Sequence, residues 1–272
     1  MLNDKLSMFE SELICSGYAK STIQGYVKHI AQFNAFTDCA FFDHPFNKCT
    51  VLDFLNSFSN INTRRNALKA LKLFFRKYLA DDSTIDEIKY PKSSRKLPIP
   101  IDFDFLKSKI SEVKNLKHRS ILALALSCGL RVSEVVSIKL SHCDSNNMTI
   151  RICDSKNGKT RLVPLSDEIR LLLHRYFLVY KPNEWLFEGE RRLAYSVSSA
   201  QLLIKTYIGA DFHFHQLRHT CATYLLDNGC DLRKIQVLLG HSQIESTAIY
   251  THVSTRLLQT ISLPFADGGL SK

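Results

Sequence analysis

The most informative stretch of the chain is His215-Gln216-Leu217-Arg218-His219-Thr220. Leu239-Gly240-His241 and Tyr250 follow it. Two histidines, an arginine and a tyrosine hydroxyl thus fall in one short C-terminal region. Cations and hydrogen-bond donors grouped near a tyrosine, with no phosphate loop and no metal motif, favour attack of that tyrosine on a phosphodiester. The pattern therefore indicates a nucleic-acid substrate.

Two further motifs lie upstream of this region. They are Ser127-Cys128-Gly129-Leu130-Arg131-Val132-Ser133-Glu134 and Asp154-Ser155-Lys156-Asn157-Gly158-Lys159-Thr160-Arg161-Leu162-Val163-Pro164-Leu165. From about residue 98 to about residue 257, the order and intervals of the motifs resemble those of the tyrosine recombinases, the phage integrase and Xer class. Before residue 98 the resemblance consists only of the size and helical pattern expected of an N-terminal DNA-clamping domain.

The resemblance assigns the scissile phosphate to two arginines, Arg131 and Arg218. The nonbridging oxygens of that phosphate gain charge in the transition state, and guanidiniums suit them because they stay charged and donate from a planar fork. Glu134 matches the family's acidic position, which orients neighbouring basic groups. An isolated His-x-x-Arg pattern usually belongs to a surface or a core hydrogen bond, so the assignment depends on the motifs occurring together.

The same resemblance makes Tyr250, nine residues after His241, the nucleophile among the ten tyrosines of the chain. The attacking phenol must lose a proton and the leaving 5′ oxygen must gain one, which calls for an imidazole and an amine. By resemblance, His215 assists at the tyrosine and the phosphate. His241 hydrogen-bonds the phosphate or supports the tyrosine, and Lys156 protonates the 5′ oxygen.

Lys159 competes with Lys156 for the general-acid role, because both flank the Asn157-Gly158 pair. Counting back from Arg161-Leu162-Val163-Pro164, the family's lysine falls on Lys156. An Asn-Gly pair favours a hairpin turn, so we expect Lys156 to project from a hairpin tip.

Composition agrees with this chemistry. The 272 residues are 45% hydrophobic, which suits a globular protein of one or two cores. The net charge is +10; residues 1–90 hold 11 Lys/Arg against 10 Asp/Glu, and residues 91–272 hold 25 against 16. The basic excess therefore lies with the chemical motifs, where it attracts phosphate, although charge of this size also occurs in proteins that bind no nucleic acid.

The sequence predicts neither metal nor cofactor. Its eight cysteines form no Cys-x-x-Cys pair, which argues against a zinc ribbon and against a disulfide framework. A zinc site of His213, His215, His219 and His241 is disfavoured because the guanidinium of Arg218 repels a divalent ion. The N-terminus lacks the pattern of a signal peptide and no apolar run has transmembrane length, so we expect a cytoplasmic protein with no membrane contact.

The segment 91–100 predicts a domain boundary. Prolines and cations are concentrated there, which disfavours helix and leaves an extended basic linker, although a surface loop within one domain has the same composition. We expect residues 1–90 to form a helical DNA-binding domain. Residues 101–272 then form the catalytic domain with a C-terminal exchange segment.

Helical spacing dominates residues 1–90. Ser21-Thr22 are expected to cap a helix with apolar positions up to Phe36, and further helices are expected at 50–58 and from 62 to 78. Cations on the polar side of the third helix and in the linker are candidate DNA contacts: Arg64, Arg65, Lys69, Lys72, Arg95 and Lys96. For any one of them, a solvated helix face remains the plainer interpretation.

The second part mixes helices with a small sheet. Residues 120–126 are expected to form a helix that ends near Gly129, and Arg131 to open a new turn with Glu134 on the same side. Strands are expected at 148–153 and 161–165. Helices are expected at 167–178, 197–207, 215–228, 231–239 and 244–250.

The predicted fold is mainly α with a small β-sheet, in the two-domain clamp that the resemblance implies. The implied function is site-specific DNA recombination through a 3′-phosphotyrosine, without ATP or metal. The partners would be double-stranded DNA with paired recombination sites and three further protomers, as a homotetramer or as a heterotetramer with a related recombinase. Leu257, Leu258 and Ile261 form an apolar stripe suited to exchange between protomers, although the same residues could equally cover their own domain. A type IB topoisomerase and a non-catalytic DNA-binding regulator are the alternatives.

Overall fold

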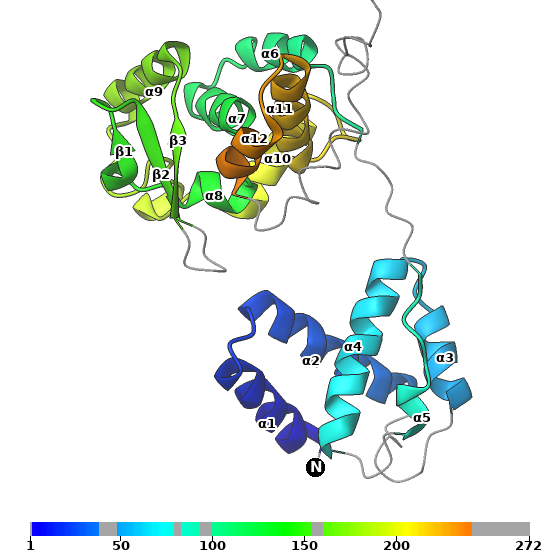
Figure 1. The fold of residues 1–272 in the computed structure, drawn as a ribbon. Coiled ribbons are helices and arrows are strands. Elements are labelled where there is room, and N and C mark those ends of the chain that lie inside the picture. The colour runs from blue at the N-terminus through cyan, green and yellow to red at the C-terminus, as the bar shows by residue number, and fades with distance from the viewer. Residues whose placement is uncertain (1, 38–47, 79–82, 93–98, 154–159, 241–272) are drawn as a thin grey trace, which may run out of the picture. The chain divides into compact units, whose positions relative to one another are not determined.

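The computed structural model describes residues 2–37, 48–78, 83–92, 99–153 and 160–240. The chain divides into two compact units, residues 1–95 and residues 96–272, each with its own hydrophobic core (Figure 1). The fold class predicted from the sequence, mainly α with a small sheet, is confirmed.

The first unit is helical in its described part. Its elements are α1 (Leu2–Cys15), α2 (Lys20–Phe36), α3 (Lys48–Asn56), α4 (Ile61–Tyr78) and α5 (Ser83–Asp86). Helix α4 supplies the largest share of the core, because its apolar face, including Leu68, Leu71 and Phe75, is fully buried. Asn60 begins this helix by accepting from the backbone N–H groups of residues 62 and 63.

Two details of α2 differ from the sequence prediction. The helix begins at Lys20 after Ala19, which supplies no side-chain cap, so Ser21 and Thr22 lie inside the first turn. Phe36, expected on the apolar face, is 45% exposed because it lies in the last turn of the helix. Ile23, Ile30 and Phe33 are buried as their spacing predicts.

The second unit is built around α7 (Leu116–Cys128), whose apolar side chains are buried on nearly every side, as befits a helix enclosed by others (Figure 1). The other helices are α6 (Phe103–Ser111), α8 (Val132–Val136), α9 (Asp167–Tyr180), α10 (Val197–Tyr207), α11 (His215–Asp227) and α12 (Leu232–Leu239). Two short 3₁₀ turns, Leu140–His142 and Glu190–Arg192, complete the helical elements. The helix expected at 244–250 lies outside the described residues.

The sheet is antiparallel, in the order β1 (Cys143–Asp144), β2 (Thr149–Cys153), β3 (Thr160–Pro164). The predicted strand pair is present. Strand β1 is not predicted by the sequence, because two residues are too few to show an alternation of polar and apolar side chains. Arg161 pairs with Ile152 and Val163 pairs with Ile150, so these four side chains share one face. Arg161 therefore projects to the buried side of β3, whereas Leu162 between them is exposed.

Within the residues that the structure describes, no helix is both long enough and apolar enough to cross a membrane.

Candidate active site

The turn between α7 and α8 places Arg131. Helix α7 ends at Gly129 with φ 60° and ψ 36°, a left-handed conformation that glycine adopts readily. Two residues later Arg131 is extended and begins α8. Glu134, in the first turn of α8, accepts from the backbone N–H of Arg131 at 2.8 Å and from its Nη1 at 2.7 Å. The carboxylate thus caps the helix to which it belongs and orients the guanidinium of Arg131. The two residues lie on the same side of the turn, as the sequence predicts.

Arg161 reaches the same carboxylate from β3. Its Nη1 donates to Oε1 of Glu134 at 2.9 Å and its Nη2 to Oε2 at 2.8 Å, in the two-pronged geometry of an arginine–carboxylate pair. Its Nε donates to the carbonyl of Leu238 in α12 at 2.8 Å. The sequence motif gives Arg161 no role beyond locating Lys156. Its position on the inward face of a strand nevertheless predicts a buried partner for its charge.

Arg218 lies on α11 and is completely buried. Its Nη1 donates to the carbonyl of Gly129 at 2.8 Å and its Nη2 to the carbonyl of Leu239 at 2.6 Å. A further 3.8 Å separates its Nη1 from Oε2 of Glu134. Three arginines therefore surround one carboxylate, and two of them also hold the carbonyls at the end of α12.

Two histidines lie one turn apart on α11, with the rings of His215 and His219 perpendicular at a centroid distance of 4.6 Å. His215 and Arg131 both line a cavity of about 580 Å³, to which α10 contributes Gln201 and Lys205. The structure therefore brings together, at one hollow, a guanidinium and an imidazole that the sequence assigns to the same chemistry.

Desolvation and charge set the protonation states here. Burial by itself raises the pKa of Glu134, but the hydrogen bonds from Arg161 and the Arg131 backbone, with the charges of both arginines, outweigh it and hold that pKa at about 2. Burial, then His215 and Arg218, lower the pKa of His219 to about 4. Desolvation, then the charges of Arg218 and Arg131, lower the pKa of His215. At neutral pH the site thus holds charged arginines, a carboxylate and neutral imidazoles suited to accept a proton.

Three predicted site residues, Lys156, His241 and Tyr250, lie outside the described residues. Gly240, which ends α12 in a left-handed conformation, directly precedes His241. In the described part of the chain there is no group of three or more His, Cys, Asp or Glu side chains that could hold a metal ion.

The candidate DNA contacts of α4 differ from one another in the structure. Lys69 is exposed, whereas Arg64 donates to the carbonyl of Phe58 and Arg65 to the carbonyl of Pro91. Arg95 and Lys96 lie outside the described residues.

Lys72 corrects a prediction, because it does not lie on the polar side of its helix. It is 9% exposed, its Nζ donates to the carbonyl of Asp86 at 3.1 Å, and the ring of Tyr90 lies 5.0 Å from that Nζ. The apolar stem packs in the core while the ammonium finds partners after α4 in the chain, which helical spacing within α4 does not reveal.

Comparison with known proteins relates both units of the chain to phage integrases. The model of the phage integrase family matches residues 103–256, and that of the phage integrase N-terminal SAM-like domain matches residues 6–85. Tyrosine recombinase XerA of Pyrococcus horikoshii is 32% identical over 270 residues, covering 94% of this chain and 92% of the relative. Tyrosine recombinase XerC of Staphylococcus carnosus is 29% identical, covering 90% and 91%.

Among solved structures, the lambda integrase tetramer bound to a Holliday junction has a TM-score of 0.75 at 17% identity, covering 92% of this chain and 76% of that one. At this identity the likeness concerns the fold.

Proposed function

Since this chain belongs to the phage integrase family, we propose that it is a tyrosine recombinase that cuts and rejoins DNA at specific sites. One observation carries the proposal: Arg131, oriented by Glu134, lines the same cavity as His215. A phosphodiester in that cavity would meet a fixed positive charge and a neutral imidazole together. The same proposal places the protein in the cytoplasm.

In the proposed reaction the Tyr250 oxygen attacks the scissile phosphorus, a 3′-phosphotyrosine forms, and the 5′ oxygen leaves with a proton from Lys156. The 5′-hydroxyl of a partner duplex then attacks the phosphotyrosine and releases the tyrosine. The ester conserves the bond energy, so the exchange requires no ATP. His215 takes up the phenol proton and His241 hydrogen-bonds the phosphate.

Arg131 and Arg218 are proposed to bind the nonbridging oxygens. Arg131 has a side chain 34% exposed and is already presented to the cavity. Arg218 is fully buried with carbonyls of Gly129 and Leu239 on its two Nη groups. For Arg218 to hold phosphate, its guanidinium must become accessible to the phosphate oxygens, because the side chain has no exposed surface here.

The domain assignment follows from this function. We propose that residues 1–90 bind DNA, with exposed Lys69 among the phosphate contacts, and that residues 101–272 carry the chemistry. Residues 91–100 would join the two as the linker. The match of residues 6–85 to the N-terminal domain of phage integrases supports the first part of this division.

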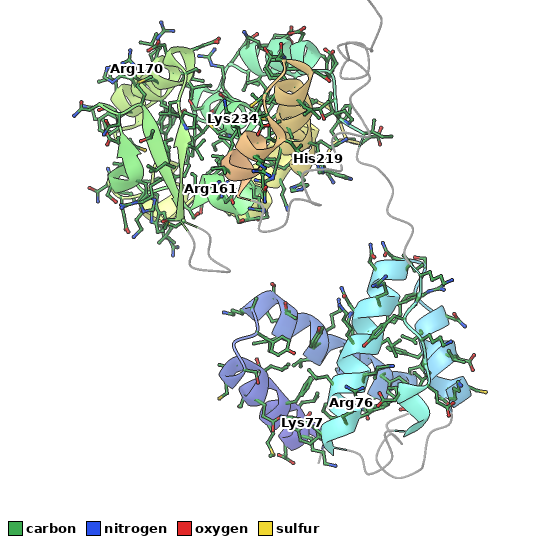
Figure 2. The ribbon with its side chains drawn as sticks, in the orientation of Figure 1. Arg76, Lys77, Arg161, Arg170, His219 and Lys234 are labelled. Carbon is green, nitrogen blue, oxygen red and sulfur yellow. The ribbon has the colours of Figure 1, made fainter. Side chains whose placement is uncertain are left out.

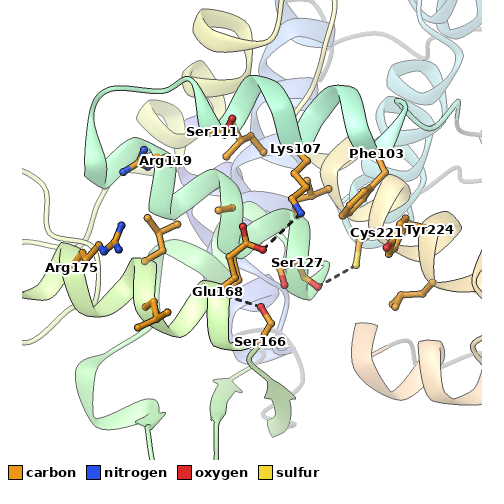
Figure 3. A pocket seen from close by; sticks show the side chains of 17 residues that line it. Phe103, Lys107, Ser111, Arg119, Ser127, Ser166, Glu168, Arg175, Cys221 and Tyr224 are labelled. Atoms are coloured by element: carbon orange, nitrogen blue, oxygen red, sulfur yellow. Dashed lines mark hydrogen bonds and ion pairs between the residues drawn. The ribbon is translucent and has the colours of Figure 1, made fainter.

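Assembly into a tetramer on two DNA sites completes the proposal. A cavity of about 640 Å³ lies between α6, α7, α9 and α11, and its lining includes Ile110, Ala123, Leu126, Leu171 and Leu225 (Figure 3). We propose that it receives the C-terminal segment of a neighbouring protomer, with Leu257, Leu258 and Ile261 as the inserted side chains. The aliphatic part of this lining matches an aliphatic stripe, although charged side chains such as Lys107 and Glu168 also line the cavity. The 32 residues after Gly240 include that stripe.

The test is covalent capture. Wild-type protein is incubated in excess EDTA with a random-sequence duplex library, and protein-linked DNA is isolated under denaturing conditions and sequenced. We expect a defined sequence joined to the protein, no adduct with Tyr250→Phe, and an undiminished adduct with Tyr180→Phe. Wild-type adduct from Tyr250→Phe, or strict dependence on magnesium, would falsify the mechanism. Strand exchange between two copies of the captured site, beyond relaxation of a single circle, separates a recombinase from a topoisomerase.

A further inference from the structure

Arg161 occupies a junction between two parts of the site. Its guanidinium makes three hydrogen bonds at 2.8 to 2.9 Å: two go to the carboxylate of Glu134 and one goes to the carbonyl of Leu238. The side chain is 11% exposed and that of Glu134 is 5% exposed. Oε1 of Glu134 receives the Nη1 groups of both Arg161 and Arg131, so one oxygen joins the two guanidiniums.

We infer that Arg161 is a positioning residue of the cleavage reaction, which holds Arg131 in place through Glu134 and holds the end of α12 through Leu238. The inference rests on the proposed function, because Arg131 is the phosphate-binding group. Every nitrogen of the Arg161 guanidinium already donates to Glu134 or Leu238, and Arg161 is not among the residues that line the cavity shared by Arg131 and His215. Its effect on the reaction must therefore pass through the groups it touches.

The geometry explains why this position requires an arginine. Without Arg161, the carboxylate of Glu134 would be held mainly by the backbone N–H and the Nη1 of Arg131. The planar fork of Arg161 binds both oxygens from a second element, β3, and fixes them further, whereas a lysine ammonium is a single point of charge. Arg131 can then meet a phosphate without reorganisation, and preorganisation of this kind lowers the barrier.

The contact with α12 is close as well. A methyl group added at Gly240 would lie 2.9 Å from Nη1 of Arg161, so the backbone passes directly over the guanidinium. Gly240 also has φ +67°, which glycine tolerates best. The hydrogen bond from Arg161 to Leu238 therefore holds the last turn of α12.

A plain structural ion pair is the rival explanation. Buried ion pairs often contribute little net stability, and apolar residues of similar volume can replace them at no loss. Stability alone is therefore a weak reason for an arginine here. The two explanations differ in what the loss of Arg161 does to the reaction rate, to DNA affinity and to the effect of losing Glu134.

The experiment compares full-length Arg161→Gln, Arg161→Lys, Glu134→Gln and the double variant Glu134→Gln/Arg161→Gln with wild type. The control is Arg170→Gln, on α9, whose partner Asp167 lies 3.6 Å away at the surface (Figure 2). The probe is a nicked duplex of the sequence captured by wild type. Single-turnover cleavage and the DNA dissociation constant are measured at one salt concentration, and folding is followed by the fluorescence of Trp185, the single tryptophan.

We expect Arg161→Gln to cleave about 10- to 100-fold more slowly, as for other groups that orient a catalytic residue. Its dissociation constant should change less than about threefold, because ground-state binding is shared among many basic residues. Arg161→Lys keeps the charge but should recover little of the rate. The double variant should lose less than the product of the two single losses, because Arg161 and Glu134 act in part through the same contact. Arg170→Gln should match wild type.

Three results would overturn the inference. They are a wild-type cleavage rate in Arg161→Gln, equal losses of affinity and rate, and losses in the double variant that are the product of the single losses. If Arg161→Gln does not fold, Arg161→Lys decides the matter, and a wild-type rate in that variant sinks the inference. Failure of the proposed function appears separately, since wild type itself would then capture no DNA.

Discussion

At the scale of single residues, Glu134 is the centre of the arginine cluster. It accepts from the backbone of Arg131 and from the guanidiniums of Arg131 and Arg161, and Arg218 lies 3.8 Å away. Removing one partner from such a cluster leaves a buried charge uncompensated, which costs more than the pair contributes when intact. Because this carboxylate must stay charged, the cluster of arginines around it is sensitive to acid.

The pH dependence of stability follows from the pKa of Glu134. It is about 2 in the folded chain against 4.5 ordinarily, so its stabilisation is complete above pH 4.5 and is lost as the pH falls toward 2. The effect is on the order of 3 kcal/mol. Urea unfolding followed by Trp185 fluorescence should lose this acid dependence in Glu134→Gln and keep it in the exposed control Glu190→Gln. The pKa of His219 is about 4 in the folded chain against 6.5 ordinarily, so the folded state loses further stability as the pH falls from 6.5 to 4. An unchanged acid slope in Glu134→Gln would place the acid sensitivity elsewhere.

The general acid can be identified without a structural view of it. Lys156→Ala should slow cleavage of ordinary DNA, because the 5′ oxygen is a poor leaving group without a proton donor. A substrate with sulfur at the 5′ bridging position needs little such help and should restore the rate. Lys159→Ala is the matched control, and on ordinary DNA it should cleave almost normally. Rescue of Lys159→Ala by sulfur, with none for Lys156→Ala, would exchange the two roles.

At the scale of elements, the tight turn from α7 to α8 determines how closely α12 approaches. Gly129 offers its carbonyl to Arg218, and a methyl group added at Gly129 would lie 2.5 Å from Cδ2 of the buried Leu239. One backbone position thus sets both the start of α8 and the packing of α12 against α7.

Gly129→Ala and Gly229→Ala make a matched pair, because both glycines have positive φ and only the first is crowded. Each variant should lose about 1–2 kcal/mol for an alanine in the left-handed region. Gly129→Ala should lose about 1–3 kcal/mol more through overpacking against Leu239. Denaturant midpoints read from Trp185 measure the difference. Equal midpoints would mean that Leu239 moves aside freely.

At the scale of the whole molecule, the two units have separate cores, and the proposed tetramer depends on the cavity of the second unit. Leu171 lines this cavity and is 46% exposed, so Leu171→Glu should fold yet repel an apolar segment. Val179, 68% exposed on the same helix and outside the cavity lining, provides the control Val179→Glu.

We expect Leu171→Glu, and a chain ending at residue 256, to bind single DNA sites but to assemble poorly on two. Sedimentation velocity with paired-site DNA gives the measurement, with Val179→Glu assembling as wild type. If both altered proteins form tetramers of normal stability, the cavity plays no part in assembly.

Residues with local signals were predictable. The spacing of Leu68, Leu71 and Phe75 is enough to place α4, and Gly129 is enough to end α7, because helical periodicity and capping involve only near neighbours. Arg131, Glu134, His215 and Arg218 are identified by the resemblance to the tyrosine recombinases, and the structure brings them together. The sequence by itself thus determined the elements, the fold class and the chemistry that the motifs suggest.

Tertiary structure alone decided which partners those residues find. Arg161 lies 27 positions from Glu134 and 77 from Leu238, and Lys72 turns into the core toward Asp86, 14 positions away. Arg218 has no exposed surface, although its place in the motif suggested a group open to phosphate. Local pattern contains no record of such contacts, because burial and hydrogen-bond partners depend on how distant segments pack around a charge that cannot remain unpaired.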